Sequence, residues 1–234
     1  MMETTRRATR QAVRLIVLCL TTLLSLNSMA QVGSWRAFPS YYEPQQIVKA
    51  DNILYVRASN GLYSYNLNDQ SITTYDKVKQ LNDAYITLIA WNPTVKRLII
   101  VYQNSNIDLL DNNGNVYSIS SLYTKSMTQN KTVFNINIYD KYAYLSTYFG
   151  VVKVNMERAE IAESYILDHK ITFVDIRGED IYLKNQGSSD FWVIKSKTYL
   201  NLIDPHNWKY TSSYPDDLFI EDLTDWNENI DLVK

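Results

Sequence analysis

A strand–turn–strand motif that recurs at nearly constant spacing restricts the fold of this chain more than any other feature. Its clearest copy is Ile53–Asn66, in which the turn pair Asn60-Gly61 separates two apolar runs. Asn and Gly tolerate positive φ at low cost, so this pair favours a tight turn between two strands. Weaker copies follow at spacings of 45, 44 and 40 residues, counted between the apolar residues after each turn: Leu62, Ile107, Val151 and Phe191. A hairpin repeated in this way indicates an architecture built from similar units.

Two further strand-like runs flank each copy, which gives four expected strands per repeat. The first strands are Gln46–Lys49, Ile86–Trp91, Val133–Tyr139 and Ile171–Ile176. The second strands are Leu54–Arg57, Leu98–Tyr102, Tyr142–Ser146 and Ile181–Lys184. The fourth strands are Ile72–Tyr75, Val116–Ile119, Ile161–Tyr165 and Tyr199–Ile203. Phe134–Ile138 alternates as a half-buried strand does, and no long helical period occurs after residue 30.

These repeats predict an all-β fold, a β-propeller whose blades are four-stranded antiparallel sheets. The expected blades are residues 45–80, 84–121, 131–166 and 170–203, within a propeller region of residues 31–203. A single blade cannot bury both faces of its sheet, so the blades must stack against one another. Four blades allow a closed four-bladed ring or an incomplete arc of a larger propeller, and we favour the arc.

The two ends of the propeller region bear on this choice. Trp35–Phe38 would complete the last blade of a closed ring, and it would lack its normal partner in a truncated one. Residues 204–234 are interpreted as an acidic tail or as the truncated start of the next blade, with Asp217–Ile220 and Asn229–Val233 as its strand-like parts. An arc with uncapped end blades is expected to self-associate.

Residues 1–30 have the composition of a signal peptide. A basic segment, Arg6–Arg14, precedes the apolar run Leu15–Leu26, and Ser28-Met29-Ala30 is a small-x-small cleavage signal. The alternative is a membrane anchor, but the run is well short of the ~20 residues that span a bilayer. The sole cysteine, Cys19, lies in this run without the small preceding residue of a lipoprotein signal. We therefore expect an exported chain without disulfides, located in the periplasm or on the outer cell surface.

The charge of the expected mature chain argues against nucleic acid as a partner. Removal of residues 1–30 takes away four arginines and one glutamate, which leaves 19 basic and 24 acidic residues and a net charge near −5. No basic patch is visible in the sequence. All 19 tyrosines lie in the remaining part, and a tyrosine-rich composition favours strands.

The sequence predicts no catalytic, cofactor-binding or metal-binding residues. The two histidines, His169 and His206, have no second ligand at metal-site spacing. Asp168-His169 lacks a serine in a nucleophile elbow. Asp111–Asn115 has its glycine in the wrong place for a calcium loop, so we interpret it as a hairpin turn. The carboxylate pairs Asp216-Asp217 and Glu221-Asp222 are interpreted as surface charge rather than as a glycosidase pair.

Aromatic residues are the remaining candidates for a binding site. Stacking on sugar rings would suit six of them, Tyr41, Tyr42, Tyr85, Trp91, Tyr123 and Tyr148. The competing and favoured interpretation is that they pack between blades. Propeller ligands usually bind at the central channel or its mouth, but the sequence does not identify ligand-binding residues there. Asn130-Lys131-Thr132 matches a glycosylation acceptor, which a bacterial exported chain need not use.

Four segments of the chain resemble one family. Residues 35–41, 58–65, 101–110 and 143–152 are similar to the amino-terminal β-propeller of PorZ-type proteins, which belong to the two-component-regulator-like propellers of Bacteroidetes. The resemblance covers residues 33–165 well and 170–203 more loosely. It implies an exported accessory of the type IX secretion system that binds lipopolysaccharide or secretion-complex proteins and is not itself the peptidase.

The chain also departs from this family. PorZ-type proteins have a second propeller and a carboxy-terminal β-sandwich, whereas this sequence stops at Lys234. Related propellers form the periplasmic sensor of hybrid two-component regulators, which is the alternative function. A truncated fragment without independent function and an enzyme on a propeller scaffold remain the other hypotheses. The expected function is a non-enzymatic exported propeller that binds a glycan or a protein partner.

Overall fold

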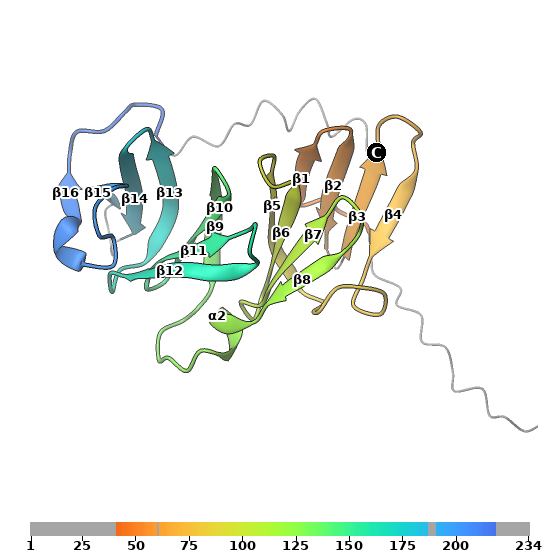
Figure 1. Cartoon of the computed structure of the whole chain (residues 1–234), viewed down its shortest axis with the longest axis horizontal. Helices are drawn as coiled ribbons and strands as arrows, with labels where there is room; N and C mark the ends of the chain where they lie inside the picture. The colour runs from red at the N-terminus through yellow and green to blue at the C-terminus, as the bar shows by residue number, and fades with distance from the viewer. Residues whose placement is uncertain (1–40, 60, 187–190, 219–234) are drawn as a thin grey trace, which may run out of the picture. The chain divides into compact units, whose positions relative to one another are not determined.

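Four antiparallel four-stranded sheets make up the computed structural model, which describes residues 41–59, 61–186 and 191–218 (Figure 1). The first sheet, blade 1, contains β1 Gln46–Ala50, β2 Ile53–Ala58, β3 Gly61–Asn66 and β4 Ile72–Tyr75. Blade 2 contains β5 Ile86–Asn92, β6 Arg97–Tyr102, β7 Ile107–Asp111 and β8 Val116–Ile119. In both sheets the strands pair in chain order, so each is a simple meander.

Blades 3 and 4 repeat this order. Blade 3 contains β9 Val133–Tyr139, β10 Tyr142–Thr147, β11 Gly150–Asn155 and β12 Glu160–Ile166. Blade 4 contains β13 Ile171–Arg177, β14 Asp180–Gln186, β15 Phe191–Lys197 and β16 Lys209–Thr211. The short helices α2 Ser121–Thr124 and η1 Pro205–Asn207 lie in connections. The prediction of four-stranded antiparallel propeller blades is confirmed.

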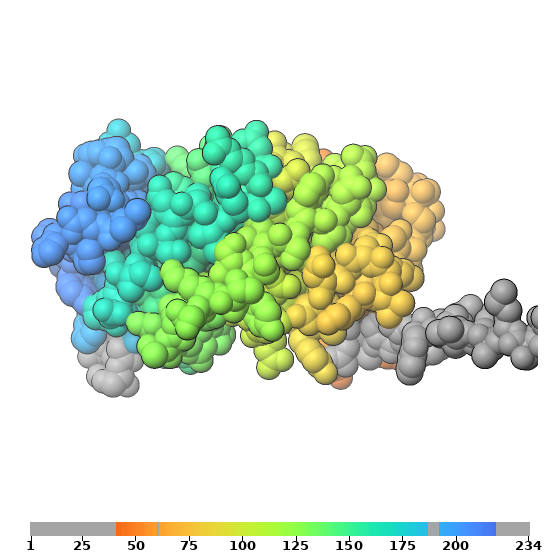
Figure 2. All heavy atoms as spheres, turned by 60° about the horizontal axis from the view of Figure 1, so that its bottom comes forward, coloured from red at the N-terminus to blue at the C-terminus, as the bar shows by residue number. Residues whose placement is uncertain are grey.

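Neighbouring blades pack face to face, and their first strands β1, β5, β9 and β13 lie next to one another in turn. The coloured blades abut in the space-filling view (Figure 2). Among the described elements, blades 1 and 4 share no comparable contact, so the sheets do not close into a ring. This agrees with the predicted incomplete arc.

Alternating side chains of the central strands explain the stacking. In β6, Leu98 and Ile100 pack in the cluster between blades 1 and 2, whereas Ile99 and Val101 pack in the cluster between blades 2 and 3. All four are fully buried. A sheet with a neighbour on each face needs apolar residues at every position of its central strands, rather than at alternate ones.

The prediction for the fourth strand of blade 4 is wrong. Tyr199–Ile203 is not a strand, because the fourth strand is β16, which follows η1. Side chains bond to nearby backbone here: Asn201 accepts from the N–H of Ile203 at 3.2 Å, and Asp204 accepts from the N–H of His206 at 3.0 Å. Such local bonds favour turns over strand pairing, and Pro205 begins the short helix.

Several expectations concern residues outside the described ones. These are the signal peptide at 1–30, Trp35–Phe38, Asn60 of the first turn, the carboxylate pair Glu221-Asp222, and Asn229–Val233. Asp217–Leu218, the described part of the expected strand Asp217–Ile220, forms a turn instead. Leu218 packs on Tyr182 and Val193 of blade 4, and Arg177 lies 3.5 Å from the Asp217 carboxylate.

The helices of the described part of the chain are short. None of them has both the length and the hydropathy that a membrane-spanning helix requires.

Candidate functional site

One end of the blades carries the segments that join each blade to the next. These segments are residues 76–85, 120–132 and 167–170, and we call this end the connection face. Strand direction alternates within each blade, so the turns between second and third strands open on the same face. Backbone bonds tie the two sets together: the Gln103 N–H donates to the Tyr85 carbonyl at 2.8 Å, and the Leu167 N–H donates to the Phe149 carbonyl at 2.8 Å.

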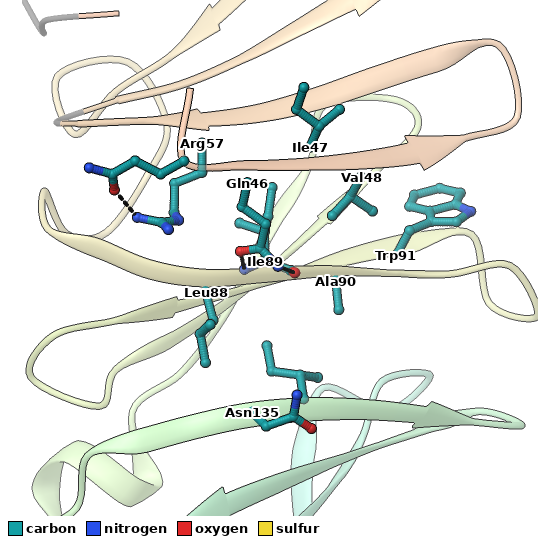
Figure 3. A pocket seen from close by; sticks show the side chains of 11 residues that line it. Gln46, Ile47, Val48, Arg57, Leu88, Ile89, Ala90, Trp91 and Asn135 are labelled. Atoms are coloured by element: carbon teal, nitrogen blue, oxygen red, sulfur yellow. Dashed lines mark hydrogen bonds between the residues drawn. The ribbon is translucent and has the colours of Figure 1, made fainter. Parts of the chain in front are cut away.

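A cavity of about 430 Å³ lies along the first strands of blades 1 to 3 (Figure 3). It is lined by Gln46–Val48 of β1, Leu88–Trp91 of β5 and Asn135–Ile136 of β9, together with Gln45 and Arg57. We call it the channel cavity, because the first strands of propeller blades surround the central axis. Its apolar walls and few polar groups are typical of a ligand site.

Gln46 closes part of the cavity wall. Its side-chain Nε2 donates to the Ile89 carbonyl at 2.8 Å, and its Oε1 accepts from the Ile89 N–H at 3.0 Å (Figure 3). This pair of bonds links β1 to β5 and satisfies both backbone groups of Ile89. Because the amide is already bound within the protein, Gln46 has a structural role in the wall.

Arg57 is the cation of the channel cavity, and its hydrogen bonding is incomplete. One Nη of its guanidinium donates to Gln45 Oε1, as Figure 3 shows. Its Nε is buried and has no hydrogen-bond partner among the described residues. None of the described carboxylates lies within 4.0 Å of it. Burial lowers the pKa of Arg57 below its ordinary value, because desolvation disfavours the charged form.

Asn135 brings a second polar group to the cavity from blade 3. Its side chain lines the cavity beside β9 (Figure 3). The backbone around it is fixed, because Ser146 Oγ lies 3.4 Å from the Asn135 carbonyl and donates to the Thr172 carbonyl at 3.1 Å. Arg57 and Asn135 together offer N–H donors on opposite sides of an apolar wall. This arrangement can hold an oxygen-rich or anionic group and contains no nucleophile.

A smaller cavity of about 160 Å³ lies on the connection face, beside Asp83, Tyr85 and Asn104. Below it, the fully buried Asp108 carboxylate accepts from the Tyr102 hydroxyl at 2.6 Å and from the N–H and side-chain amide of Asn82, each at 2.9 Å. Burial, followed by this bond to Asp108, raises the pKa of Tyr102 above its ordinary value. All three of these partners of the Asp108 carboxylate belong to the protein itself. Asp108 therefore anchors segment 76–85 to blade 2.

The residues considered for catalysis or metal binding are not assembled into a site. His169 Nε2 lies 3.1 Å from the Tyr210 hydroxyl, and His206 Nδ1 lies 2.9 Å from Asp204. The part of the chain that the structure describes contains no cluster of three metal-ligating side chains. Asp111 accepts from the N–H of Asn113 at 2.8 Å, as in a hairpin turn.

The six candidate aromatic residues fall into two groups. Trp91 is buried and stacks on Tyr55 at 6.1 Å between blades 1 and 2, and Tyr41 packs edge-on against Tyr63 at 5.7 Å. The exposed ones are Tyr42, Tyr85, Tyr123 and Tyr148. Tyr85, Tyr123 and Tyr148 lie in connections or second-to-third-strand turns of the connection face. Tyr42 precedes β1 and accepts from the Ser59 N–H at the same end.

Sequence reasoning did not single out Arg57 or Gln45. The available signal was a lone charged residue near the end of the apolar strand Ile53–Ala58. A charge at such a position is usually solvated in a sheet with one free face. Only the contact between blades 1 and 2 shows that Arg57 lies over a cavity.

Comparisons with known proteins agree on the propeller. A family model, the N-terminal β-propeller domain of PorZ from the type IX secretion system, matches residues 54–209. PorZ of Porphyromonas gingivalis, described as an essential bacterial surface component of that system, superposes with a TM-score of 0.71 at 25% identity. The match covers 77% of this chain and 24% of PorZ, so the chain spans about a quarter of that protein's length. No curated protein matches the sequence.

More distant structures share the fold alone. The extracellular domain of the putative one component system BT4673 from B. thetaiotaomicron has a TM-score of 0.53 at 16% identity, over 78% of this chain and 24% of the other. Apo AztD from Citrobacter koseri has a TM-score of 0.51 at 14% identity, over 73% and 46% of the two chains.

Proposed function

Because the chain belongs to the PorZ N-terminal β-propeller family of the type IX secretion system, we propose that it is a non-enzymatic exported binding module. It works in the periplasm or at the outer cell surface, where PorZ of Porphyromonas gingivalis is a surface component. Its ligand is lipopolysaccharide, held through an anionic group. A protein of the secretion complex is the alternative partner.

The single observation that carries this proposal is the incomplete hydrogen bonding of Arg57 in the channel cavity. A buried donor without a partner is rare and costs free energy. A carboxylate or phosphate oxygen placed against the guanidinium would satisfy Nε and neutralise the charge in one step. Asn135 would add a donor from blade 3, and the apolar wall beside β1 and β5 would exclude water.

Binding of lipopolysaccharide from the chain's own host to the purified chain tests this proposal directly. We expect saturable binding that Arg57→Gln weakens about 10- to 100-fold, because a hydrogen bond to a charged group contributes about 1.5–3 kcal/mol. Lys49→Gln is the matched control, since it removes an exposed charge from β1 outside the cavity. Its affinity should stay within about twofold of the parent chain.

The outcomes separate the two kinds of partner. Loss of binding in Arg57→Gln but not in Lys49→Gln supports a channel site for an anionic glycolipid. Equal affinity of both variants for lipopolysaccharide would mean that the glycolipid binds outside the channel cavity. Folded chain that fails to bind lipopolysaccharide would rule out the glycolipid and leave the protein partner.

A further inference from the structure

The connections between blades differ greatly in length, and the shortest leaves part of one interface between blades exposed. Residues 76–85 cross the interface of blades 1 and 2, where Leu81 is buried in its core. Residues 120–132 cross the interface of blades 2 and 3, where Leu122 is buried. Only four residues, 167–170, join blade 3 to blade 4. Such a short segment covers less of its interface: Leu167 packs against the core, and His169 reaches Tyr210 of β16.

The uncovered part of the blade 3–4 interface exposes two aromatic rings. Tyr210 lies opposite Ile194 in the pairing of β15 with β16, so Trp192 and Tyr210 share one face of the sheet as a diagonal pair. Ile194 on that face is buried against blade 3. Trp192 and Tyr210 are nevertheless 49% and 60% exposed. They are therefore residues on the interface side of a propeller blade that the described residues cover only in part.

The two rings form a corner with a polar rim. Their centroids are 6.3 Å apart and their planes meet at 85°. His169, from the short connection, lies with its ring centroid 6.3 Å from that of Tyr210, and its Nε2 is 3.1 Å from the tyrosine hydroxyl. This bond fixes the direction of the Tyr210 ring. The corner thus combines apolar ring faces with an imidazole and a hydroxyl at one end.

We propose that this aromatic corner, formed by His169, Trp192 and Tyr210, is a stacking site for one pyranose ring of a glycan. A pyranose has an apolar C–H face that packs on an aromatic ring, and hydroxyls at its edge that bond to groups such as the Tyr210 hydroxyl and the imidazole. A protein partner would need a wide apolar patch. The corner consists of two rings, and its neighbours in the chain, Asp168, Lys209 and Ser212, are exposed polar residues.

The inference deepens the proposed function, on which it rests for the identity of the ligand as a glycan. It adds a second site that is separate from Arg57 and the channel cavity. A polysaccharide chain has many sugar units and can engage both places at once. Two weak sites joined by one polymer give a higher apparent affinity than either alone.

Tryptophan fluorescence and affinity measurements on the purified chain test the corner. The probes are an array of defined oligosaccharides and the delipidated polysaccharide of the host lipopolysaccharide. We expect Trp192→Ala to weaken binding about tenfold and Tyr210→Phe to weaken it a few fold, since the ring stays and only the hydroxyl is lost. Tyr199→Ala is the matched control, because Tyr199 is a 67% exposed aromatic of the same blade outside the corner.

The results distinguish this inference from the proposed function. Polysaccharide binding that Trp192→Ala leaves unchanged, in a variant with the parent melting temperature, overturns the corner while the channel proposal stands. Oligosaccharide binding that depends on Trp192, in a chain that fails to bind the host lipopolysaccharide, supports the corner and removes the proposed ligand. A chain that binds neither probe overturns both.

Discussion

Single side chains fix the spacing between neighbouring blades, and Gln46 is the clearest case. Its amide satisfies both the N–H and the carbonyl of Ile89 in the wall of the channel cavity. Replacement by Leu keeps the size but removes both bonds. We expect Gln46→Leu to lower the free energy of unfolding by about 1–3 kcal/mol, the cost of leaving buried polar groups unpaired.

Urea denaturation followed by fluorescence measures this loss. Gln129→Leu is the control, because Gln129 is exposed in the connection before β9 and makes no contact between blades. Unchanged stability in Gln46→Leu would mean that water replaces the amide and that the interface between blades 1 and 2 does not depend on it.

Two glycines with positive φ give a matched pair of substitutions. A Cβ on Gly150, at φ +141°, would lie 1.9 Å from the Tyr165 carbonyl oxygen, whereas a Cβ on Gly114, at φ +83°, meets nothing within 4 Å. We expect Gly150→Ala to cost about 3 kcal/mol or more, since the strand backbone must move. Gly114→Ala should cost only about 1 kcal/mol from backbone strain.

Thermal unfolding of the two variants compares them directly. We expect the larger drop in melting temperature for Gly150→Ala, because Gly150 lies where β11 pairs with β12. Equal melting temperatures for the two variants would show that the close approach of β11 to β12 is relieved at no cost.

At the scale of elements, the buried Asp108 holds a long connection onto blade 2. Its three hydrogen bonds reach Tyr102 and Asn82, and Asn82 belongs to segment 76–85. We expect Asp108→Ala to destabilise the chain by about 3 kcal/mol, because it leaves the donors of Tyr102 and Asn82 without a partner in a buried site. Hydrogen exchange within residues 76–85 should become faster than exchange in the neighbouring strands.

Asp111→Ala provides the comparison for this prediction. Asp111 caps only its own hairpin turn, through Asn113 and Asn115. Its loss should speed exchange in that turn alone. Equal exchange in residues 76–85 of both variants would show that the connection is held by Leu81 and not by the carboxylate.

Fifteen of the sixteen strands lie where the repeats place them, because turn residues and apolar runs are local signals. The sixteenth, β16, was missed because the run Tyr199–Ile203 has strand composition but lies between side chains that cap turns. Trp208, just before β16, is buried and donates to the Leu202 carbonyl at 3.0 Å. That contact joins two residues that no periodicity links.

The candidate site was far less predictable than the fold. Arg57 becomes a binding candidate only because β1 and β5 enclose it, and Trp192 only because the connection before β13 is short. Both facts concern distances between blades. A single sequence records the composition of each blade but not what the next blade covers.

At the scale of the whole molecule, stability should depend on whether a residue lies between two blades or at an end of the row. Val152 is buried in the large cluster between blades 2 and 3, and Val193 in a cluster of three buried residues on the outer face of blade 4. We expect Val152→Ala to cost about 2 kcal/mol and Val193→Ala about 1 kcal/mol, because the smaller cluster collapses more easily around the lost methyls.

Equilibrium unfolding in urea measures the loss of unfolding free energy for each of the two Val→Ala variants. A larger loss for Val193→Ala would mean that the outer face of blade 4 is as tightly packed as an internal interface. The shared chemistry of the two changes removes differences in side-chain type from the comparison.

Strand pairing runs within each sheet, and the described blades are joined by side-chain contacts and a single connecting segment. A tether pulling on one end of the chain would therefore load these interfaces one at a time. Under tension we expect stepwise peeling, with one force peak per blade, instead of a single rupture. Anchored at one end, such a chain would yield gradually to mechanical strain and keep its remaining blades folded.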